Sequence, residues 1–538
     1  MKVSKTGIYT VTPESDGLKA VHGSDRIRSD YPDYLKDESN VTGADAESLF
    51  FPRSLNHLVK IMMDAREKGK KVTISGGRTG ICAGAVPAEG GYLVSLEKMT
   101  GILGLDYVFG DLTLRVESGI RLSELSARVR SKDLGPEIEF PDELKRNNKH
   151  YFYPPDPTET TATIGGTVAT NASGARTLFY GPTRDYVEGI EVVLSTGELL
   201  RVNRGEVRAE NGCFRVPKEK GRPLIIPAPS YMMPRTKHSA GLYSKKSMDL
   251  IDLFIGSEGI LGVIAGVSVR LIEEPGVFLG GMAFFEEESD AVDFVVGAKK
   301  GDIRPISLEY FDRDALTLLE DTRKSQGPVS EIPPIPEKDA AVYFESAVFK
   351  SGKPDVSGLK QEYLKWKSLI ETSRGDPSIA WAALNKRDIM RLKAFRHALP
   401  ESVNKIISQR KRMDGRIHKV GTDMAVPDRH LKEIIRYYRS ELGHERIASV
   451  IFGHIGDSHL HVNMIPDTYD QLLKARDLYK KFAKKAVYLG GTVSAEHGIG
   501  KLKKDYLAIL YPPDALEEME TIKSSLDPDH VLNPGNVI

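Results

Sequence analysis

The chain has 538 residues, more than a single hydrophobic core accommodates, so two or three domains are expected. Its 75 Lys and Arg residues balance 75 Asp and Glu residues, which disfavours nucleic acid as a bulk partner. Two cysteines, Cys82 and Cys213, exclude a disulfide framework and an iron–sulfur cluster ligated within the chain. The N-terminus has no signal-peptide core and no apolar run reaches membrane-spanning length, so a reduced, cytoplasmic protein is expected.

A helix and a glycine-rich loop come first in the chain. Ser54–Lys68 carries apolar side chains at helical spacing, with Ser54 as the N-cap. The stretch KVTISGGRTGICAGAVPAEGGYLVSL, residues 71–96, then places a glycine-rich loop between two β-type runs. Backbone amides in such a loop can form an anion nest for a pyrophosphate. The glycines fit neither a GxGxxG nor a GxxxxGK[ST] motif, which disfavours a Rossmann nicotinamide site and a P-loop.

The next segments are predicted from alternation and periodicity. Asp111–Gly119 alternates like a half-buried strand, and Leu122–Val129 has the spacing of a helix. Residues 130–150 are charged and broken by prolines, so we expect an exposed insertion there. Val187–Leu200 indicates two strands joined by a Ser-Thr-Gly turn, and residues 203–247 are expected to be irregular.

The stretch YPPDPTETTATIGGTVATNASGARTLFYGPTRD, Tyr153–Asp185, has almost no large apolar side chain between Ala162 and Ala175. A core strand or helix would need large apolar side chains there, whereas small residues let the backbone approach a large planar or phosphorylated ligand. A Gly/Thr-rich surface loop is the plainer alternative. Two stretches of the same character weigh against that alternative: residues 71–96, and Leu250–Arg270, where Gly256-Ser257-Glu258-Gly259 lies between two apolar runs.

From residue 276 the pattern indicates a second α+β unit. Strand-like runs (Val277–Phe285, Ala341–Val348, Ala448–Phe452) alternate with helical ones (Asp290–Ala298, Leu359–Ile370, Arg429–Leu442, Asp470–Leu489). Gly490-Gly491 is expected to end the last of these helices.

The three glycine-rich stretches, in this order and followed by the C-terminal LDPDHVLNPGNV, resemble the FAD-linked 2-hydroxyacid dehydrogenases. This branch of the vanillyl-alcohol-oxidase/PCMH-type flavoproteins includes D-lactate dehydrogenase, the glycolate oxidase flavin subunit and D-2-hydroxyglutarate dehydrogenase. The resemblance covers nearly the whole chain and implies an α+β fold. It implies a PCMH-type FAD-binding domain of two α+β subdomains over residues 1–275 and an α+β cap over residues 276–510. The tail, residues 511–538, would return to the FAD domain.

The same resemblance assigns the FAD contacts. The pyrophosphate would lie on Gly76-Gly77-Arg78-Thr79-Gly80. The isoalloxazine and ribityl chain would follow Pro155, Thr158, Gly165, Gly166, Ala169, Asn171 and Gly174, with Glu258, Gly259 and Ile264 near the adenine side and Asn533 contributed by the tail. Covalent relatives carry a flavin-linked His directly after the paired glycines, where this chain has Arg78. FAD is therefore expected to be held non-covalently, with Arg78 as a counter-charge to the phosphates.

Histidines gather in two segments of the cap, GHIGDSHLHVN (Gly453–Asn463) and SAEHGIGK (Ser494–Lys501). They hold four of the chain's 13 His, and Glu496 stands beside the last of them. Imidazole and carboxylate together suit a borderline divalent cation such as Zn²⁺ or Mn²⁺, although any single His could instead have a structural role.

The resemblance assigns roles within this cluster: His454, His461 and Glu496 as metal ligands, His497 as the general base, and Asn463 as a substrate contact. His459 stands where relatives often have Asn. Strand alternation places it on the same face as His461, so His459 is a rival ligand.

A third feature is RHALPESVNKIISQRKRMDGRIHKVGTDMAVP, Arg396–Pro427. Arg396 matches the family's arginine that grips the substrate carboxylate, a bidentate task suited to guanidinium. Lys419 is a weaker candidate for substrate binding, because its alignment is uncertain by two residues. The run Arg410-Lys411-Arg412 is interpreted as a solvated loop, or alternatively as a docking patch for an electron acceptor.

These expectations describe an FAD-dependent dehydrogenase of a small D-2-hydroxy acid. Electrons would leave to an electron-transfer flavoprotein, an iron–sulfur subunit, a quinone or oxygen; a homodimer and a peripheral position at the inner membrane face are both compatible with the sequence. One alternative is a non-redox alkylglycerone-phosphate synthase, although those proteins carry three His where this chain has Ala495-Glu496-His497. Another is a flavin electron-transfer subunit, which would leave Arg396 and the His cluster unexplained.

Overall fold

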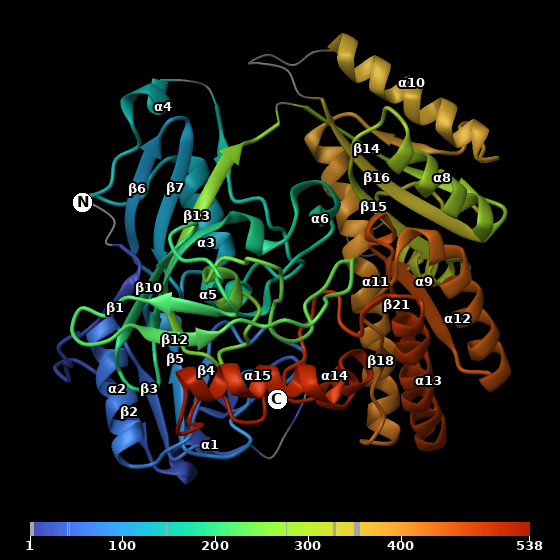
Figure 1. The fold of residues 1–538 in the computed structure, drawn as a ribbon. Coiled ribbons are helices and arrows are strands. Elements are labelled where there is room, and N and C mark those ends of the chain that lie inside the picture. The colour runs from blue at the N-terminus through green and yellow to red at the C-terminus, as the bar shows by residue number, and fades with distance from the viewer. Residues whose placement is uncertain are drawn as a thin grey trace.

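The computed structural model describes residues 5–39, 41, 44–146, 149–275, 277–325, 330–348 and 356–538. Figure 1 shows two halves side by side, one coloured blue to green and the other yellow-green to red. Helices α14 (Lys504–Leu510) and α15 (Pro513–Leu526) lead from the second half back beneath the first. The mixture of helix and sheet confirms the predicted α+β class. Among the described helices, none is long and apolar enough to cross a membrane.

The first sheet of the N-terminal half has the strand order β2-β3-β5-β4, in which β3, β5 and β4 run parallel. Its elements are β2 (Lys19–His22), α1 (Ser24–Asp30), η1 (Pro32–Tyr34), β3 (Ser48–Phe51), α2 (Leu55–Glu67), β4 (Val72–Ser75), β5 (Tyr92–Ser95) and η2 (Leu96–Lys98). The predicted helix and its cap are confirmed, since Ser54 accepts a hydrogen bond from the His57 amide at the start of α2. The glycine-rich loop leaves the end of β4, as predicted.

The second sheet has the order β1-β10-β9-β13-β7-β6, with β8 paired to the end of β13. Its strands are β1 (Gly7–Tyr9), β6 (Ile102–Val108), β7 (Asp111–Glu117), β8 (Tyr151–Phe152), β9 (Val187–Val193), β10 (Leu199–Asn203) and β13 (Val263–Glu273). Around it lie α3 (Leu122–Ser131), α4 (Asp142–Arg146), α5 (Ile164–Thr170), α6 (Thr177–Tyr180), η3 (Thr183–Tyr186), α7 (Ile251–Phe254) and the hairpin β11 (Cys213–Val216) and β12 (Leu224–Pro227). The alternating strand at 111–119, the helix at 122–129 and the hairpin at 187–200 are confirmed.

The second half contains one sheet of order β17-β14-β16-β15-β20-β21-β18, with β19 paired to β21. Its strands are β14 (Val277–Phe285), β15 (Pro305–Asp312), β16 (Ala340–Val348), β17 (Trp381–Ala383), β18 (Val420–Gly421), β19 (Met424–Ala425), β20 (Ser449–Gly453) and β21 (His459–Met464). The helices are α8 (Glu288–Lys300), α9 (Arg313–Lys324), α10 (Val356–Thr372), α11 (Lys386–Met413), η4 (Asp428–His430), α12 (Leu431–Glu445), η5 (Ile455–Asp457) and α13 (Tyr469–Tyr488). The predicted alternation of strands and helices is therefore confirmed.

Helices cover both faces of this sheet, so successive strand residues enter two different cores. Leu308 and Tyr310 of β15 join the core that includes α8, α10 and α12, whereas Phe311 packs with α9 and α11. Glu309 and Glu345 belong to the α11 face of the sheet, and both are only 1% exposed.

Three local predictions were wrong. Arg410-Lys411-Arg412 is not a loop but the last turn of α11, which continues past Pro400. Cations are favoured at this C-terminus because of the helix dipole. Residues 130–150 are not simply an exposed insertion, because Leu134, Phe140 and Leu144 are buried in the main core; residues 147 and 148 lie outside the described part. The irregular region 203–247 contains the β11–β12 hairpin. In each case tertiary packing overrides a polar local composition.

The central stretch, which has few large side chains, contains helix α5. Its sequence lacks the helical spacing of large apolar residues that would predict a helix. Thr163 caps it by accepting from the Gly166 amide at 3.3 Å, and Ile164 and Val168 supply its buried face. The helix is short because Asn171 adopts a left-handed conformation, with φ 48°, at its C-cap.

The C-terminal tail extends the first sheet. The Val72 amide donates to the Val531 carbonyl at 2.7 Å, and the Asn533 amide donates back to the Val72 carbonyl at 2.8 Å. The Asn533 side chain accepts from the Ile74 amide at 2.7 Å and donates to the Glu258 carbonyl at 2.8 Å. The tail therefore lies directly beside the strand from which the glycine-rich loop emerges.

Candidate active site

The loop 76–80 lies against the start of α5, and glycine makes this approach possible. A Cβ on Gly76 would lie 2.6 Å from Thr163 Oγ1, and one on Gly77 would lie 2.9 Å from the Thr161 carbonyl oxygen. Gly165 is similarly constrained, since its Cβ would lie 2.5 Å from Ser118 Cβ. Two segments about 90 positions apart in the chain thus bring their backbones together.

This junction has unused donors. The amides of Gly77, Arg78, Thr79 and Gly80 donate to no backbone or side-chain acceptor among the described residues, and Arg78 has the left-handed φ of 59°. The buried atoms Ser75 Oγ, Arg78 Nη1, Ser118 Oγ and Ser173 Oγ have no hydrogen-bond partner in the described part of the chain. Neighbouring amides and buried donors of this kind fit a phosphorylated ligand such as FAD. The rest of the Arg78 guanidinium stacks 4.3 Å from the Tyr34 ring centroid and lies 3.6 Å from Glu97.

The turn Gly256-Ser257-Glu258-Gly259 packs against the same junction, at the end of α5. The amides of Gly256 and Glu258 donate to the carbonyls of Val168 and Ala169 at 2.9 and 2.7 Å. A Cβ on Gly174 would collide with the Asp156 carbonyl, and Gly259 has φ 75°. The structure thus brings together the predicted loop, the segment from Pro155 to Gly174 and the turn up to Ile264.

Two of the predicted cofactor residues use their side chains within the protein. Glu258 accepts hydrogen bonds from the amides of Ile499 and Gly500, each at 2.7 Å. The side-chain amide of Asn533 accepts a hydrogen bond from the Ile74 amide and donates one to the Glu258 carbonyl. Any contact that they make with FAD would therefore use other atoms.

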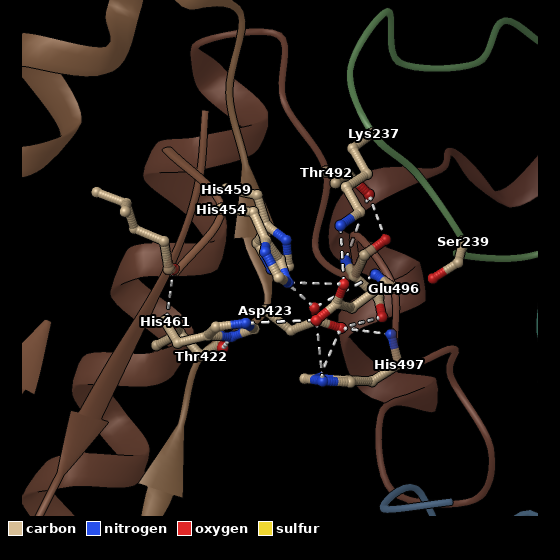
Figure 2. Close-up of polar contacts among 12 residues, drawn as sticks. Lys237, Ser239, Thr422, Asp423, His454, His459, His461, Thr492, Glu496 and His497 are labelled. Atoms are coloured by element: carbon tan, nitrogen blue, oxygen red, sulfur yellow. Dashed lines mark hydrogen bonds and ion pairs between the residues drawn. The ribbon is translucent and has the colours of Figure 1, made fainter. Parts of the chain in front are cut away.

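The histidine cluster of the second half converges on Glu496 (Figure 2). His454 Nε2 lies 3.3 Å from Glu496 Oε2, and His461 Nε2 lies 3.4 Å from Glu496 Oε1. Ligand atoms of His454, His459, His461 and Glu496 lie within 4.8 Å of one another, as do those of Asp423, His461, Glu496 and His497. The predicted ligands are therefore brought together, and His459 remains a rival.

Hydrogen bonds orient two of these rings. His454 Nδ1 lies 2.5 Å from Glu309 Oε1, and His461 Nδ1 lies 2.9 Å from the Thr422 carbonyl oxygen. With Nδ1–H donating in both rings, Nε2 is the atom of each that faces Glu496 and is left for a metal ion, which is the usual second-shell arrangement for a metal ligand. This donor set fits a divalent cation.

Burial and the surrounding charges shift the ionisation of these groups. Burial lowers the pKa of His461, and it lowers the pKa of His459 to about 3. Although burial also opposes charge on His454, the adjacent Glu309 carboxylate raises the pKa of His454 to about 9. Glu496 is buried too, yet Lys237 and His454 hold its pKa well below its usual range.

Asp423, between β18 and β19, joins the second part of the cluster. Its Oδ2 accepts from Lys503 Nζ at 2.8 Å, from Ser494 Oγ at 2.6 Å and from the His497 amide at 3.1 Å. His497 Nδ1 lies 3.3 Å from the same oxygen, while His497 Nε2 lies 3.5 Å from Glu496 Oε1. Despite full burial, His497 and Lys503 hold the pKa of Asp423 well below its usual range.

His459 Nε2 lies 3.1 Å from Asp423 Oδ1, but the geometry is not that of a hydrogen bond, and both ring nitrogens lack a partner among the described residues. His459, His461 and Asn463 alternate along β21, which places them on one face of the strand. Asn463 is buried opposite Gly421 in the β18–β21 pair.

Lys237 reaches the cluster from the N-terminal half (Figure 2). Its ammonium donates to Glu496 Oε2 at 2.8 Å and lies 4.0 Å from Asp457 Oδ2. Sequence reasoning missed the roles of Lys237, Asp423 and Glu309. Asp423 could have been found as the single acidic residue in KVGTDMAVP, but Glu309 lies in an ordinary strand and carries no local signal.

Arg396 projects from α11 to the seam between the halves. Its Nε donates to Glu309 Oε2 at 2.7 Å, and its Nη1 donates to Thr158 Oγ1 at 3.2 Å, which joins it to a predicted flavin-side residue. Lys419 does not share this site, because its ammonium donates to Asn404 Oδ1 at 2.9 Å. Arg396 is thus the predicted carboxylate-binding cation that the fold places beside the His cluster.

Two known families match successive parts of the chain. Residues 46–142 and 142–203 match the family described as FAD binding domain. Residues 280–537 match the family described as FAD linked oxidases, C-terminal domain.

Similar proteins align over most of their length. Glycolate oxidase subunit GlcD of Bacillus subtilis is 27% identical, covering 91% of this chain and 88% of that protein. A D-lactate dehydrogenase of Anaerostipes hadrus is 28% identical, covering 94% of this chain and 92% of that protein. A D-2-hydroxyglutarate dehydrogenase of Xanthomonas citri is 27% identical, covering 91% and 89%.

Solved structures show the same fold. One of alkyldihydroxyacetonephosphate synthase matches with a TM-score of 0.60 at 14% identity, covering 98% of this chain and 86% of that one. With an FAD-binding domain, an FAD-linked oxidase C-terminal domain and relatives of this kind along its whole length, the chain belongs to the FAD-linked oxidase family that includes these 2-hydroxyacid enzymes.

Proposed function

We propose that the protein oxidises a small D-2-hydroxy acid, of which D-lactate is the type, to the 2-oxo acid with FAD as the oxidant. One observation carries the proposal: Arg396 and Glu309 link the flavin-side Thr158 to His454 of the His cluster. A carboxylate-binding cation, a hydroxyl-activating site and the flavin cradle are therefore adjacent. The relatives named for glycolate, D-lactate and D-2-hydroxyglutarate support a 2-hydroxy acid as the substrate class.

FAD would be held by the loop 76–80 and the segment 155–174, and it supplies a hydride acceptor. Zn²⁺ or Mn²⁺ would be held by His454, His461 and Glu496, where a divalent cation makes a bound hydroxyl more acidic. Because His454 and His461 each give Nδ1–H to another acceptor, their Nε2 atoms are the ones available to the ion.

The chain's own groups orient the substrate and take its proton. The guanidinium of Arg396 binds the carboxylate through the nitrogens that Glu309 leaves free. Asp423 Oδ2, which lies 3.3 Å from His497 Nδ1, would orient the ring so that Nε2, which faces Glu496, accepts the hydroxyl proton. Asn463 on the same strand as His461 is a further substrate contact. Electrons then pass to an external acceptor, for which an electron-transfer flavoprotein, an iron–sulfur subunit, a quinone or oxygen are the candidate classes.

Acid or heat is expected to release intact FAD from the purified yellow protein. The reason is that Arg78, part of whose guanidinium packs against Tyr34 and Glu97, stands where covalent relatives carry a linking His. The measurement is the distribution of flavin fluorescence after denaturing gel electrophoresis. Flavin that migrates with the polypeptide would contradict non-covalent binding.

Arg396→Lys is expected to raise the substrate KM by about 10- to 100-fold, because lysine cannot reproduce the charge-assisted fork of guanidinium. Steady-state kinetics with D-lactate, glycolate and D-2-hydroxyglutarate measure the effect, and the flavin spectrum should stay unchanged. Arg412→Lys, an exposed arginine on the same helix, is the matched control. Unchanged kinetics in Arg396→Lys would place the carboxylate site elsewhere, with Lys419 as the next candidate.

The variants Glu496→Gln and His497→Asn are expected to lose activity for different reasons. Glu496→Gln removes a ligand charge, so metal content should fall and added divalent cation should restore part of the activity. His497→Asn should keep the metal but lower kcat by about 10²–10⁴, the usual contribution of a general base, with no response to added metal. Metal content by mass spectrometry and kcat separate the two. Loss of metal from His497→Asn, or full activity of the wild type after chelation, would refute this division of roles.

A further inference from the structure

The carboxylate of Glu309 contacts both the proposed substrate cation, Arg396, and a proposed metal ligand, His454. It lies on β15, is 1% exposed, and has one oxygen on Arg396 Nε at 2.7 Å and the other on His454 Nδ1 at 2.5 Å. The two proposed sites therefore share a single buried anion.

We propose that Glu309 is a positioning residue that couples the carboxylate site to the metal site by fixing the tautomer of His454. The inference rests on the proposed function and adds a residue that no sequence motif marks. Glu309 acts through its neighbours, since Arg396 and His454 lie between it and the ligands that they would bind.

The coupling follows from the donor and acceptor capacity of each group. Arginine can only donate, whereas a neutral imidazole donates from one nitrogen and accepts at the other. A carboxylate accepts from both partners at once. With a cation bound, His454 would therefore keep its proton on Nδ1 and leave Nε2, the atom that faces Glu496, for the metal.

Replacing Glu309 by glutamine removes one of the two acceptors. The amide oxygen must face Arg396, because Arg396 cannot accept a hydrogen bond, so the amide NH₂ faces His454 Nδ1. His454 then accepts at Nδ1 and carries its proton on Nε2, the atom that the metal requires. The substitution changes little in shape but turns the ring into the wrong tautomer.

Glu345 provides a matched control. It lies on the adjacent strand β16, is equally buried, and is also paired with an arginine, with its Oε2 2.8 Å from Arg176 Nη2. Its other oxygen faces Lys393 at 3.3 Å and accepts from the Tyr343 hydroxyl. Glu345→Gln therefore imposes the same loss of buried charge without touching His454.

The experiment measures Zn²⁺ affinity of the FAD-containing protein by competition with a chromogenic chelator. Glu309→Gln is expected to weaken Zn²⁺ binding by about 10- to 100-fold, the usual effect of removing a second-shell partner, while Glu345→Gln stays within about threefold of the wild type. Propionate, a carboxylate without the hydroxyl, should still perturb the flavin spectrum of Glu309→Gln, because Arg396 keeps its acceptor.

The decisive variant combines Glu309→Gln with Arg396→Met. Without Arg396 the amide can turn its oxygen toward His454, so Zn²⁺ affinity should recover to within about threefold of the wild type. The double variant also leaves no unpaired buried charge, so it tests the inference even if Glu309→Gln alone does not fold.

Failure to recover in the double variant, or wild-type Zn²⁺ affinity in Glu309→Gln, would overturn the coupling. A wild-type protein that binds neither Zn²⁺ nor propionate would instead overturn the proposed function itself.

Discussion

The two hydrogen bonds that the Glu258 carboxylate accepts from the amides of Ile499 and Gly500 hold the site together, because they dock one half of the molecule on the other. The carbonyl of the same residue accepts from the side chains of Asn533 and Asn536 in the tail. Burial raises the pKa of Glu258 to about 7, although these amides favour its ionised form. One residue thus joins the flavin-side turn, the segment that carries Glu496 and His497, and the C-terminus.

Buried ion pairs then cross the same seam. Lys237 of the N-terminal half binds Glu496, and Arg176 binds Glu345, while Arg396 of the second half reaches Thr158. Such pairs add little net stability because desolvation offsets their attraction, but leaving one partner unpaired is costly. They therefore favour one docked arrangement over others. This arrangement places the His cluster and Arg396 beside the segment that contains Thr158.

Much of the fold could be predicted from local pattern. The strand Val277–Phe285 and the helix capped by Ser54 follow directly from alternation and capping. The glycines at 76, 77 and 165 could be predicted to mark close backbone approach, although not that they face Thr163, Thr161 and Ser118. Helix α11 was missed because Pro400 and the basic run after it argue locally for a break, whereas its apolar face is buried by the sheet.

The candidate site was predictable where residues cluster in the sequence. His454, His461 and Glu496 lie in two short segments, and imidazole with carboxylate signals metal chemistry by composition. Lys237 and Glu309 could not be found in this way, because each comes from a distant segment and owes its role to the docking of the halves. When single charged residues pair across long sequence distances, they create no local pattern from which the pairing could be predicted.

The central claim is that a 2-hydroxy acid reduces the flavin in this protein. The most direct measurement is anaerobic mixing of the purified protein with D-lactate, glycolate and D-2-hydroxyglutarate, each beside its L-enantiomer where one exists, while the flavin absorbance is recorded. The account predicts that at least one of these acids bleaches the flavin, with a 2-oxo acid formed in equal amount. Flavin that dithionite reduces but that none of these acids bleaches would contradict it.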